Sequence, residues 1–279
     1  MDTKKVWFVT GASKGLGLTL VKKLLAEGHC VSATSRKISE LQKAIGEEAS
    51  GFLPLQVDLV NEESVAAAIS ETIAKFGKLD VVVNNAGYGQ LGTLEELTDL
   101  ESRRNFDINV FGSLNVIRKS MPHFRAQKSG SVINIASIGG LSGEFAGWGV
   151  YCATKFAVVG FTEALAAEVK EFGIHATVVY PGYFRTDFLT GGSLGTPENE
   201  IEEYTAARQL QAAHEKDING NQPGDPEKAA LALTELAAME NPPLHLVLGS
   251  DAFEMAGKKL TALQSEISDF KTLSISTDY

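Results

Sequence analysis

The stretch that decides the fold is Thr10-Gly11-Ala12-Ser13-Lys14-Gly15-Leu16-Gly17. It follows a short apolar run, Val6–Val9, that is typical of a buried strand, and it precedes apolar residues at helical spacing from Leu20 to Leu25. Glycines at such a junction allow a tight turn and a close approach of the backbone to a ligand. The helix that follows offers free N–H groups and the positive end of its dipole. The sequence therefore predicts a phosphate-binding turn, because the strand–turn–helix context disfavours the alternative of a glycine-rich turn without a ligand.

Apolar runs and helical patterns alternate along the rest of the chain. The runs lack polar–apolar alternation, as strands buried on both faces of a sheet require, and helical patterns cover residues 62–76, 100–121 and 151–172. Repeated strand–helix–strand units predict an α/β fold, a doubly wound, parallel, Rossmann-like sheet in one domain. The expected strands after the first are Val31–Ser35, Phe52–Val57, Val81–Val83, Val132–Ile135, Ala176–Val179 and Leu244–Leu248.

One region, residues 187–224, breaks this rhythm. It combines glycine-rich and proline-containing turns with a polar helical stretch, Ile201–Glu215. A connection this long is usually functional or mobile, so we expect a lid insertion after the sixth strand that closes over a substrate. We expect one domain over residues 1–250 and a polar C-terminal extension over residues 251–279 that frays at its end.

Composition excludes several classes of protein. The chain has 279 residues, 44% of them hydrophobic, and a formal net charge of −10, so we expect a well-buried core and no general binding to nucleic acid. No uninterrupted apolar run approaches the roughly 18 residues of a membrane span, and the start of the chain leaves no room for a secretory signal. The only two cysteines, Cys30 and Cys152, cannot form a disulfide framework, which favours a cytoplasmic location. The five histidines show no metal-ligand spacing, so we expect no metal.

Four ordered motifs resemble those of the short-chain dehydrogenases/reductases, in their compact single-domain branch. They are the glycine turn with its G-x-x-x-G-x-G spacing, Asn84-Asn85-Ala86-Gly87 after the fourth strand, Tyr151-Cys152-Ala153-Thr154-Lys155, and Pro181-Gly182 with Thr186. The resemblance implies a nicotinamide dinucleotide cofactor. Besides Tyr151 and Lys155, it implies cofactor contacts from Gly11, Ser13, Lys14, Gly15, Leu16, Gly17, Asp58, Leu59, Asn85, Ala86, Gly87, Pro181, Gly182, Phe184 and Thr186.

The end of the second strand indicates which nicotinamide cofactor is bound. NAD-binding sites normally offer an acidic residue to the ribose 2′-OH about 20 residues past the glycine turn, whereas an arginine suits a 2′-phosphate. Here Arg36 and Lys37 follow the strand, and Lys14 adds a cation within the turn. We therefore expect NADP(H). The alternative is that Arg36 and Lys37 belong to an ordinary solvated loop.

The candidate catalytic residues are Ser137, Tyr151, Lys155 and Asn109. Tyr151 and Lys155 are four residues apart on an expected helix and so share one face. A nearby ammonium stabilises a phenolate, so we expect the pKa of Tyr151 to lie below its ordinary value of about 10 when Lys155 and the positive charge of the nicotinamide act on it together. The resemblance implies that Ser137 donates a hydrogen bond to the substrate, that Tyr151 exchanges the proton, and that Asn109 anchors a proton relay with Lys155. Asn109 could also be only a helix-bending polar residue.

The loop between Ser137 and Tyr151 departs from the family pattern by one extra residue. Ser142 is therefore an alternative hydrogen-bond donor, although its spacing to Tyr151 fits less well. The residues Leu141, Phe145, Trp148, Tyr183, Phe188 and Leu189 cluster near the reactive positions in sequence, where they would line an apolar substrate pocket or serve as routine packing.

These features predict an NADP(H)-dependent oxidoreductase that interconverts a ketone or aldehyde with an alcohol by hydride transfer. The substrate would be a small, apolar carbonyl compound or alcohol. One alternative is a non-catalytic, NADP(H)-sensing binding protein on the same fold, although that class would be expected to lose part of the catalytic set. A sugar-nucleotide epimerase is disfavoured by the glycine spacing. The resemblance also implies a homodimer or homotetramer.

Overall fold

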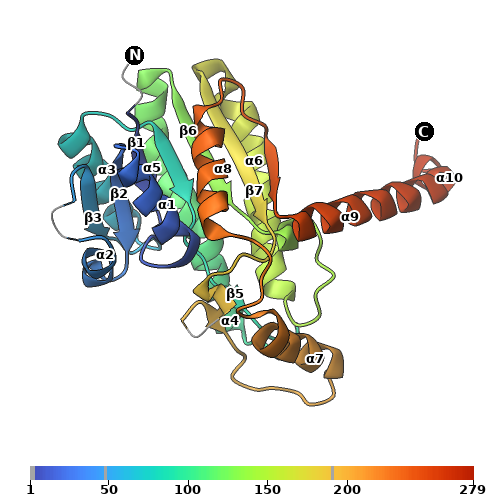
Figure 1. The fold of residues 1–279 in the computed structure, drawn as a ribbon. Coiled ribbons are helices and arrows are strands. Elements are labelled where there is room, and N and C mark those ends of the chain that lie inside the picture. The colour runs from blue at the N-terminus through green and yellow to red at the C-terminus, as the bar shows by residue number, and fades with distance from the viewer. Residues whose placement is uncertain (1–3, 47–48, 190–191) are drawn as a thin grey trace.

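A parallel sheet of seven strands lies at the centre of the computed structural model, which describes residues 4–46, 49–189 and 192–279 (Figure 1). The strand order is β3-β2-β1-β4-β6-β7-β9. From β1 the next strands along the chain, β2 and β3, lie towards one edge of the sheet, whereas from β4 the later strands lie towards the other edge. The carboxyl ends of β1 and β4 therefore form the switch point where such sheets bind ligands. The predicted doubly wound, Rossmann-like fold is confirmed. The strands are β1 (Val6–Val9), β2 (Cys30–Ser35), β3 (Phe52–Gln56), β4 (Val81–Asn84), β6 (Gly130–Ile135), β7 (Ile174–Pro181) and β9 (His245–Leu248).

Each face of the sheet carries its own hydrophobic core. Trp7 and Val9 of β1 pack on one side with α1 (Gly15–Ala26) and α8 (Pro226–Ala238), whereas Phe8 packs on the other. That second core includes residues of three helices, α3 (Glu62–Phe76), α5 (Gly112–Gln127) and α6 (Gly149–Val169). Since successive side chains of a strand point to opposite faces, a strand covered on both sides must be apolar at every position, as the sequence of β1 is.

The expected helix over residues 100–121 consists of three consecutive helical segments without a break in the chain between them. A capping box between Thr98 and Glu101 starts α4 (Asp99–Phe106), a π-helical turn follows at Asp107–Phe111, and α5 continues to Gln127. π-Helical turns inside α-helices frequently mark functional sites, and this one contains Asn109. The structure also has a short helix α2 (Ile38–Ile45) beside β2 and β3.

The 187–224 insertion folds against the carboxyl ends of the strands (Figure 1). Its strand β8 (Leu194–Gly195) pairs in parallel with β5 (Gly89–Gln90) to form a second, two-stranded sheet. The expected helix at 201–215 begins only at Thr205, as α7 (Thr205–Ala213), and continues as a π-helical turn over His214–Ile218. Short 3-10 turns complete the connections at Ile138–Gly140, Lys170–Phe172 and Asp187–Leu189.

A buried ion pair fastens this insertion to the domain. Arg208 of α7 donates to both carboxylate oxygens of Glu96 at 2.8 Å, and Glu96 also accepts from the backbone N–H groups of Thr93 and Ile201. Burial opposes ionisation of Glu96, but these hydrogen bonds and the Arg208 charge outweigh it and hold its pKa below the ordinary value. The insertion is therefore docked at a defined position.

The C-terminal region is helical as far as Ile275, and the last four residues, 276–279, lie outside any helix. Helix α9 (Ser250–Asp269) packs its first turns on the domain through Ala252 and Ala256, and α10 (Lys271–Ile275) follows it. The expected extension at 251–279 is thus part of the domain where it begins and projects from it only later (Figure 1).

Helix α6 and the turn after it, residues 149–172, are long and apolar enough to span a membrane, with a mean hydropathy of 1.3. The expectation that no segment reaches this length considered only uninterrupted apolar runs. Several residues of α6, including Leu165 and Val169, pack in the second core of the sheet.

Candidate active site

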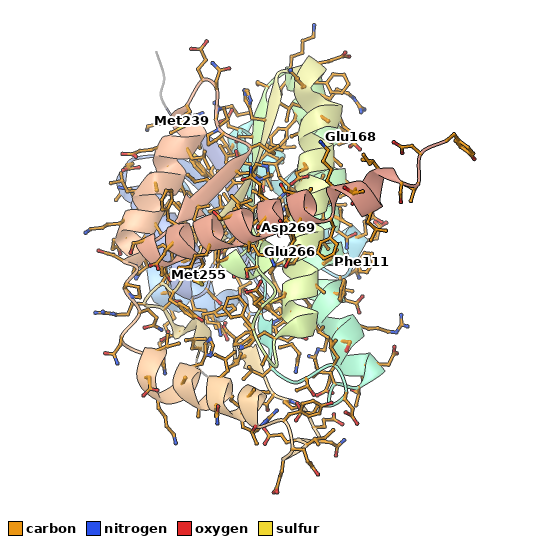
Figure 2. The ribbon with its side chains drawn as sticks, turned by 90° about the vertical axis from the view of Figure 1, so that its right-hand side faces the viewer. Phe111, Glu168, Met239, Met255, Glu266 and Asp269 are labelled. Atoms are coloured by element: carbon orange, nitrogen blue, oxygen red, sulfur yellow. The ribbon has the colours of Figure 1, made fainter. Side chains whose placement is uncertain are left out.

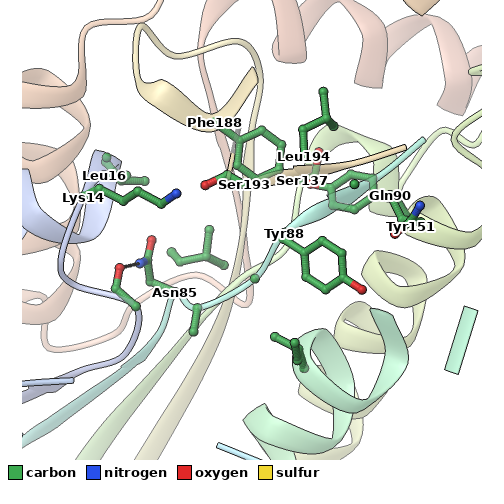
Figure 3. A pocket seen from close by; sticks show the side chains of 18 of the residues that line it. Lys14, Leu16, Asn85, Tyr88, Gln90, Ser137, Tyr151, Phe188, Ser193 and Leu194 are labelled. Atoms are coloured by element: carbon green, nitrogen blue, oxygen red, sulfur yellow. Dashed lines mark hydrogen bonds between the residues drawn. The ribbon is translucent and has the colours of Figure 1, made fainter. Parts of the chain in front are cut away.

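A cavity of about 1400 Å³ opens at the carboxyl ends of β1, β4, β6 and β7 and extends beneath the 187–224 insertion (Figure 3). The loops after these strands carry the four motifs singled out in the sequence. Parallel strands place their carboxyl ends at the same edge of the sheet, so motifs far apart in the chain meet here.

The glycine turn lies tightly against the loop after β4. The Asn85 side-chain amide donates to the carbonyls of Thr10 and Gly11 at 2.9 and 3.0 Å, and the Thr10 hydroxyl accepts from the N–H groups of Asn85 and Ala86. A Cβ on Gly11 would lie 2.6 Å from Ala86 Cα, and one on Gly17 would lie 2.4 Å from Asn85 Nδ2. These two glycines are therefore required by close packing.

The start of α1 is electrostatically prepared for an anion. Its first turn contains no acidic residue, and Lys14 at the N-cap position makes no capping hydrogen bond, so the first N–H groups remain available to a ligand. Lys14, Arg36 and Lys37 all line the cavity near this point, with Glu40 the nearby carboxylate, 3.7 Å from Lys37. The donor set fits the phosphates of a dinucleotide.

Nearly all expected cofactor residues line the cavity; Gly17 is the exception, because it lies behind the turn against Asn85. Asp58 also accepts a hydrogen bond from the Val60 N–H at 3.1 Å. The lining set is Gly11, Ser13, Lys14, Gly15, Leu16, Arg36, Lys37, Asp58, Leu59, Asn85, Ala86, Gly87, Tyr151, Lys155, Pro181, Gly182, Phe184 and Thr186.

Ser137, Tyr151 and Lys155 meet in the middle of the cavity. Ser137 follows β6, and its hydroxyl interacts with Tyr151 and accepts from the Gly139 N–H at 3.1 Å. Lys155 Nζ lies 5.8 Å from the centroid of the Tyr151 ring and donates to the Ile135 carbonyl at 2.9 Å. The structure thus brings Ser137 to the tyrosine. Ser142 is buried but is not among the residues that line the cavity.

Burial dominates the electrostatics of this group. It raises the pKa of Tyr151 above its ordinary value, although the Ser137 hydroxyl acts in the opposite direction. Burial also lowers the pKa of Lys155 from 10.5 to about 8. The expected lowering of the Tyr151 pKa requires the positive charge of the nicotinamide beside Lys155; in the protein alone the pKa is raised, because loss of solvent destabilises the phenolate.

Asn109 holds a loop and does not line the cavity. Its side chain accepts from the Tyr88 N–H at 3.0 Å and donates to the Tyr88 carbonyl at 3.1 Å and to the Thr154 hydroxyl at 3.0 Å. The residue joins the loop after β4 to the helix that carries Tyr151 and Lys155. Its side chain is placed to position these elements.

The substrate end of the cavity is rich in aromatic residues. The Trp148 ring lies edge-on to the Tyr151 ring, with 5.4 Å between the ring centroids. The centroid of the Phe188 ring, from the insertion, lies 6.1 Å from that of Tyr151. Five of the six expected pocket residues line the cavity: Phe145, Trp148, Tyr183, Phe188 and Leu189.

Leu141 corrects the expectation, because it does not line the cavity and packs instead against the two buried clusters that contain Val158 and Ala252. The turn at Ile138–Gly140 directs the chain away from the site before Leu141 is reached. Several lining residues have no signal in the sequence: Tyr88, Gln90, Leu194, His214 and Gln222.

A histidine of the insertion contacts the loop after β7. His214 Nδ1 lies 2.7 Å from the Leu210 carbonyl, which can only accept, so this nitrogen carries the proton. Nε2 of the neutral ring therefore accepts from the Tyr183 hydroxyl at 2.9 Å. Burial lowers the pKa of His214, which favours this neutral form. The pair ties the insertion to the loop that carries Pro181 and Gly182.

Asp251 supports the same loop from the other side. Its carboxylate accepts from the Tyr183 N–H at 2.7 Å, and a Cβ on Gly182 would lie 2.4 Å from both carboxylate oxygens. Asp251 stands in the first turn of α9, far from any motif, so sequence reasoning assigned it to an extension. Among the described residues, no group of three or more His, Cys, Asp and Glu side chains is arranged to hold a metal ion.

Comparison with known proteins gives a consistent family signal. The family profile described as short chain dehydrogenase matches residues 5–193. The chain is 34% identical to the oxidoreductase BOA17 of Botryotinia fuckeliana over 98% of its own length and 99% of that protein. It is 36% identical to the 3-ketodihydrosphingosine reductase of Bacteroides thetaiotaomicron over 88% of each chain.

Solved structures agree with these relatives. A short-chain dehydrogenase from Streptomyces avermitilis superposes with a TM-score of 0.91 at 34% identity, with full coverage of both chains. ElxO with NADP bound has a TM-score of 0.74 at 26% identity, covering 90% of this chain and 100% of that one. A 3-ketoacyl-(acyl-carrier-protein) reductase from Brucella melitensis complexed with NADH has a TM-score of 0.73 at 26% identity, covering 88% and 96%.

Proposed function

Because the chain belongs to the short-chain dehydrogenase/reductase family, we propose that it is an NADP(H)-dependent oxidoreductase that interconverts a ketone or an aldehyde with an alcohol. The observation that carries this proposal is the meeting of Ser137, Tyr151 and Lys155 in one cavity with the glycine turn. A nicotinamide cofactor, when bound, supplies or accepts the hydride.

The protein's own residues supply orientation and the proton. In reduction, the carbonyl oxygen of the substrate would accept hydrogen bonds from the Ser137 and Tyr151 hydroxyls. Tyr151 then donates its proton to the oxygen as negative charge develops there. Its raised pKa means that the proton is present on Tyr151 throughout the neutral range. The Lys155 ammonium, with its pKa of about 8, is largely charged at pH 7 and favours the tyrosinate that forms.

The preference for NADP(H) is supported by the charges at the cofactor end of the cavity. Arg36 and Lys37 follow β2 at the position where NAD-specific sites place an acidic residue. Lys14 lies across the same end, within the glycine turn. Arginine binds a phosphate through two parallel hydrogen bonds and lysine acts as a point charge, so this set fits a 2′-phosphate.

The walls of the cavity favour a substrate with an apolar body. Trp148, Phe188 and Leu189 surround the approach to Tyr151, whereas Gln90 is a polar residue of the same wall. We further propose a reducing, cytoplasmic location, because Cys30 and Cys152 are both free thiols.

Steady-state kinetics test the proposal. Oxidation of NADPH is followed with a panel of hydrophobic, aromatic and steroid-like ketones and aldehydes, and NADH is compared with the best substrate. We expect a higher kcat/KM with NADPH and a loss of 10²- to 10⁴-fold in kcat for Tyr151→Phe, with unchanged cofactor binding. A clear preference for NADH would refute the cofactor assignment. NADPH binding without turnover of any carbonyl would favour the cofactor-sensing alternative.

A further inference from the structure

The contact between His214 and Tyr183 fixes which of the two side chains donates the hydrogen bond. The Leu210 carbonyl requires the proton on His214 Nδ1, so Nε2 can only accept, and the Tyr183 hydroxyl donates to it at 2.9 Å. Burial lowers the pKa of His214 and raises that of Tyr183, so both side chains are neutral at pH 7. The single proton of the Tyr183 hydroxyl is therefore used, and its oxygen can act only as an acceptor towards any further group.

The Tyr183 oxygen belongs to the wall of the cavity. Tyr183 and His214 both line the cavity, and their contact joins the loop after β7 to the insertion. Among the residues that the structure describes, no side chain or backbone N–H group donates to this oxygen. An acceptor left without a donor in an occupied cavity is costly. A ligand that brings a hydrogen-bond donor to this point is therefore favoured.

A series of ring contacts places this oxygen relative to the reacting tyrosine. Trp148 contacts both Tyr151 and His214, with 5.4 and 5.1 Å between the ring centroids. The centroid of the His214 ring lies 5.5 Å from that of Tyr183. One indole ring thus separates Tyr151 from the His214–Tyr183 pair, so a ligand that extends along Trp148 can reach both.

The backbone on both sides of the Tyr183 side chain is held in place. Its N–H group donates to Asp251 at 2.7 Å, and its carbonyl accepts from the Gly224 N–H at 2.9 Å. Asp251 lies in the first turn of α9, the helix that crosses the face of the domain in Figure 2. Because the residue is fixed from two sides, its oxygen cannot easily move away from a ligand that lacks a donor, and the site can discriminate between ligands.

We propose that Tyr183 determines substrate specificity by accepting a hydrogen bond from a hydroxyl group of the substrate. The inference rests on the proposed function and names its substrate class: a ketone or aldehyde with an apolar body and a hydroxyl group remote from the reacting carbonyl. The carbonyl lies at Ser137 and Tyr151, the body along Trp148 and Phe188, and the hydroxyl group at Tyr183. An ether or a second carbonyl at that end presents only lone pairs to the Tyr183 oxygen and is disfavoured.

Three aromatic ketones that differ only at the end remote from the carbonyl test the proposal. Raspberry ketone carries a phenolic hydroxyl group, anisylacetone is its methyl ether, and benzylacetone carries neither group. Isothermal titration calorimetry measures their binding to the protein saturated with NADP⁺, or with NAD⁺ if the cofactor assignment fails, so that no ketone is reduced. We expect raspberry ketone to bind about tenfold more tightly than anisylacetone and about threefold more tightly than benzylacetone.

Binding without turnover separates this proposal from the proposed function. If raspberry ketone is preferred in binding and none of the ketones is reduced with NADPH or NADH, the proposed function fails and the role of Tyr183 stands. If the ketones are reduced but bind equally well, the proposed function stands and the role of Tyr183 fails.

Substitutions assign the preference to one oxygen atom. Tyr183→Phe removes that oxygen and keeps the ring, so the preference for raspberry ketone over anisylacetone should fall to about twofold or less. Tyr88→Phe, the same change at another tyrosine that lines the cavity, is the matched control and should leave the preference unchanged. Circular dichroism and cofactor binding confirm that each variant is folded.

His214→Phe tests the direction of the hydrogen bond. It keeps an aromatic ring beside Trp148 but removes the acceptor, so the Tyr183 proton becomes available and anisylacetone should bind about threefold more tightly than it does to wild type. A purely structural contribution of His214 would weaken all three ketones alike. Failure of raspberry ketone to bind, equal binding of the three ketones, or an unchanged preference in Tyr183→Phe would overturn the proposal. A preference lost in Tyr88→Phe would place the hydroxyl group elsewhere in the cavity and also overturn it.

Discussion

Replacing Lys155 by methionine should abolish activity and yet stabilise the protein when no cofactor is bound. Lys155 is only 5% exposed, and burial lowers its pKa from 10.5 to about 8. At 1.36 kcal/mol per pH unit, this difference means that the buried ammonium costs about 3 kcal/mol of stability at pH 7. Methionine has a similar length and carries no charge, so Lys155→Met removes this cost.

The hydrogen bond from Lys155 Nζ to the Ile135 carbonyl offsets part of the gain. Its loss costs about 1 kcal/mol, so we expect Lys155→Met to be more stable than wild type by about 2 kcal/mol at pH 7.

The stability of Lys155→Met relative to wild type must depend on pH. Below pH 8 the ammonium is charged in both the folded and the unfolded chain, and the full cost is present. Between pH 8 and 10.5 the folded chain releases the proton while the unfolded chain retains it, so wild-type stability rises with pH. Near pH 11 the cost is gone, and wild type should be more stable than the variant by about 1 kcal/mol.

Urea unfolding of the cofactor-free protein at pH 7, 9 and 10.5 measures these differences. Lys170→Met, at an exposed lysine just beyond the end of α6, is the control and should change stability by less than about 0.5 kcal/mol at each pH. A Lys155→Met variant that is no more stable than wild type at pH 7, or whose advantage is the same at pH 7 and 10.5, would refute the reasoning.

Three further substitutions follow from the contacts of the site. In Gly17→Ala, the new Cβ would lie 2.4 Å from the side-chain amide of the loop after β4, so NADPH affinity by fluorescence titration should fall at least tenfold. Asp251→Ala leaves the Tyr183 N–H without its acceptor and should cost about 1–3 kcal/mol in urea unfolding while raising the KM for cofactor. Arg208→Met leaves the Glu96 carboxylate buried without its ion-pair partner and should cost about 3–5 kcal/mol. Adding Glu96→Gln should recover much of that loss, and an equally unstable double variant would contradict the ion-pair explanation.

The sequence predicted the sheet because buried strands and glycine turns are local signals. Each expected strand is present, with ends that differ from the expected ones by no more than two residues. The fourth strand illustrates why the ends differ. Its apolar run stops at Val83, but the strand continues to Asn84, whose side chain donates to Asn134 Oδ1 of the neighbouring strand at 2.8 Å. A polar residue that donates a hydrogen bond across the sheet cannot be distinguished, in one sequence, from the beginning of a loop.

The supporting residues of the site were not predictable in the same way. Asp251 acts on Tyr183 from 68 positions along the chain, and His214 reaches the same tyrosine from the insertion. Neither belongs to a motif, since each is placed by the packing of a helix on a loop. Leu141 shows the converse: it is adjacent to the site in sequence, but one 3-10 turn directs it into a different core.

The pKa of Tyr151 depends on residues outside its sequence motif. Tyr151 and Lys155 lie on one helix as the spacing requires, and the lysine together with the positive charge of a nicotinamide predicts a lowered pKa for the tyrosine. In the protein alone the sign is reversed, because burial is the largest cause of its shift and the rings of Trp148 and Phe188 pack against the tyrosine. Trp148 belongs to the loop with the extra residue and Phe188 to the insertion, so the electrostatic setting of the motif is decided by segments outside it. A movement of the insertion that withdrew Phe188 would admit water to Tyr151 and lower its pKa. Docking of the insertion through Glu96 and Arg208 therefore helps to keep water away from Tyr151.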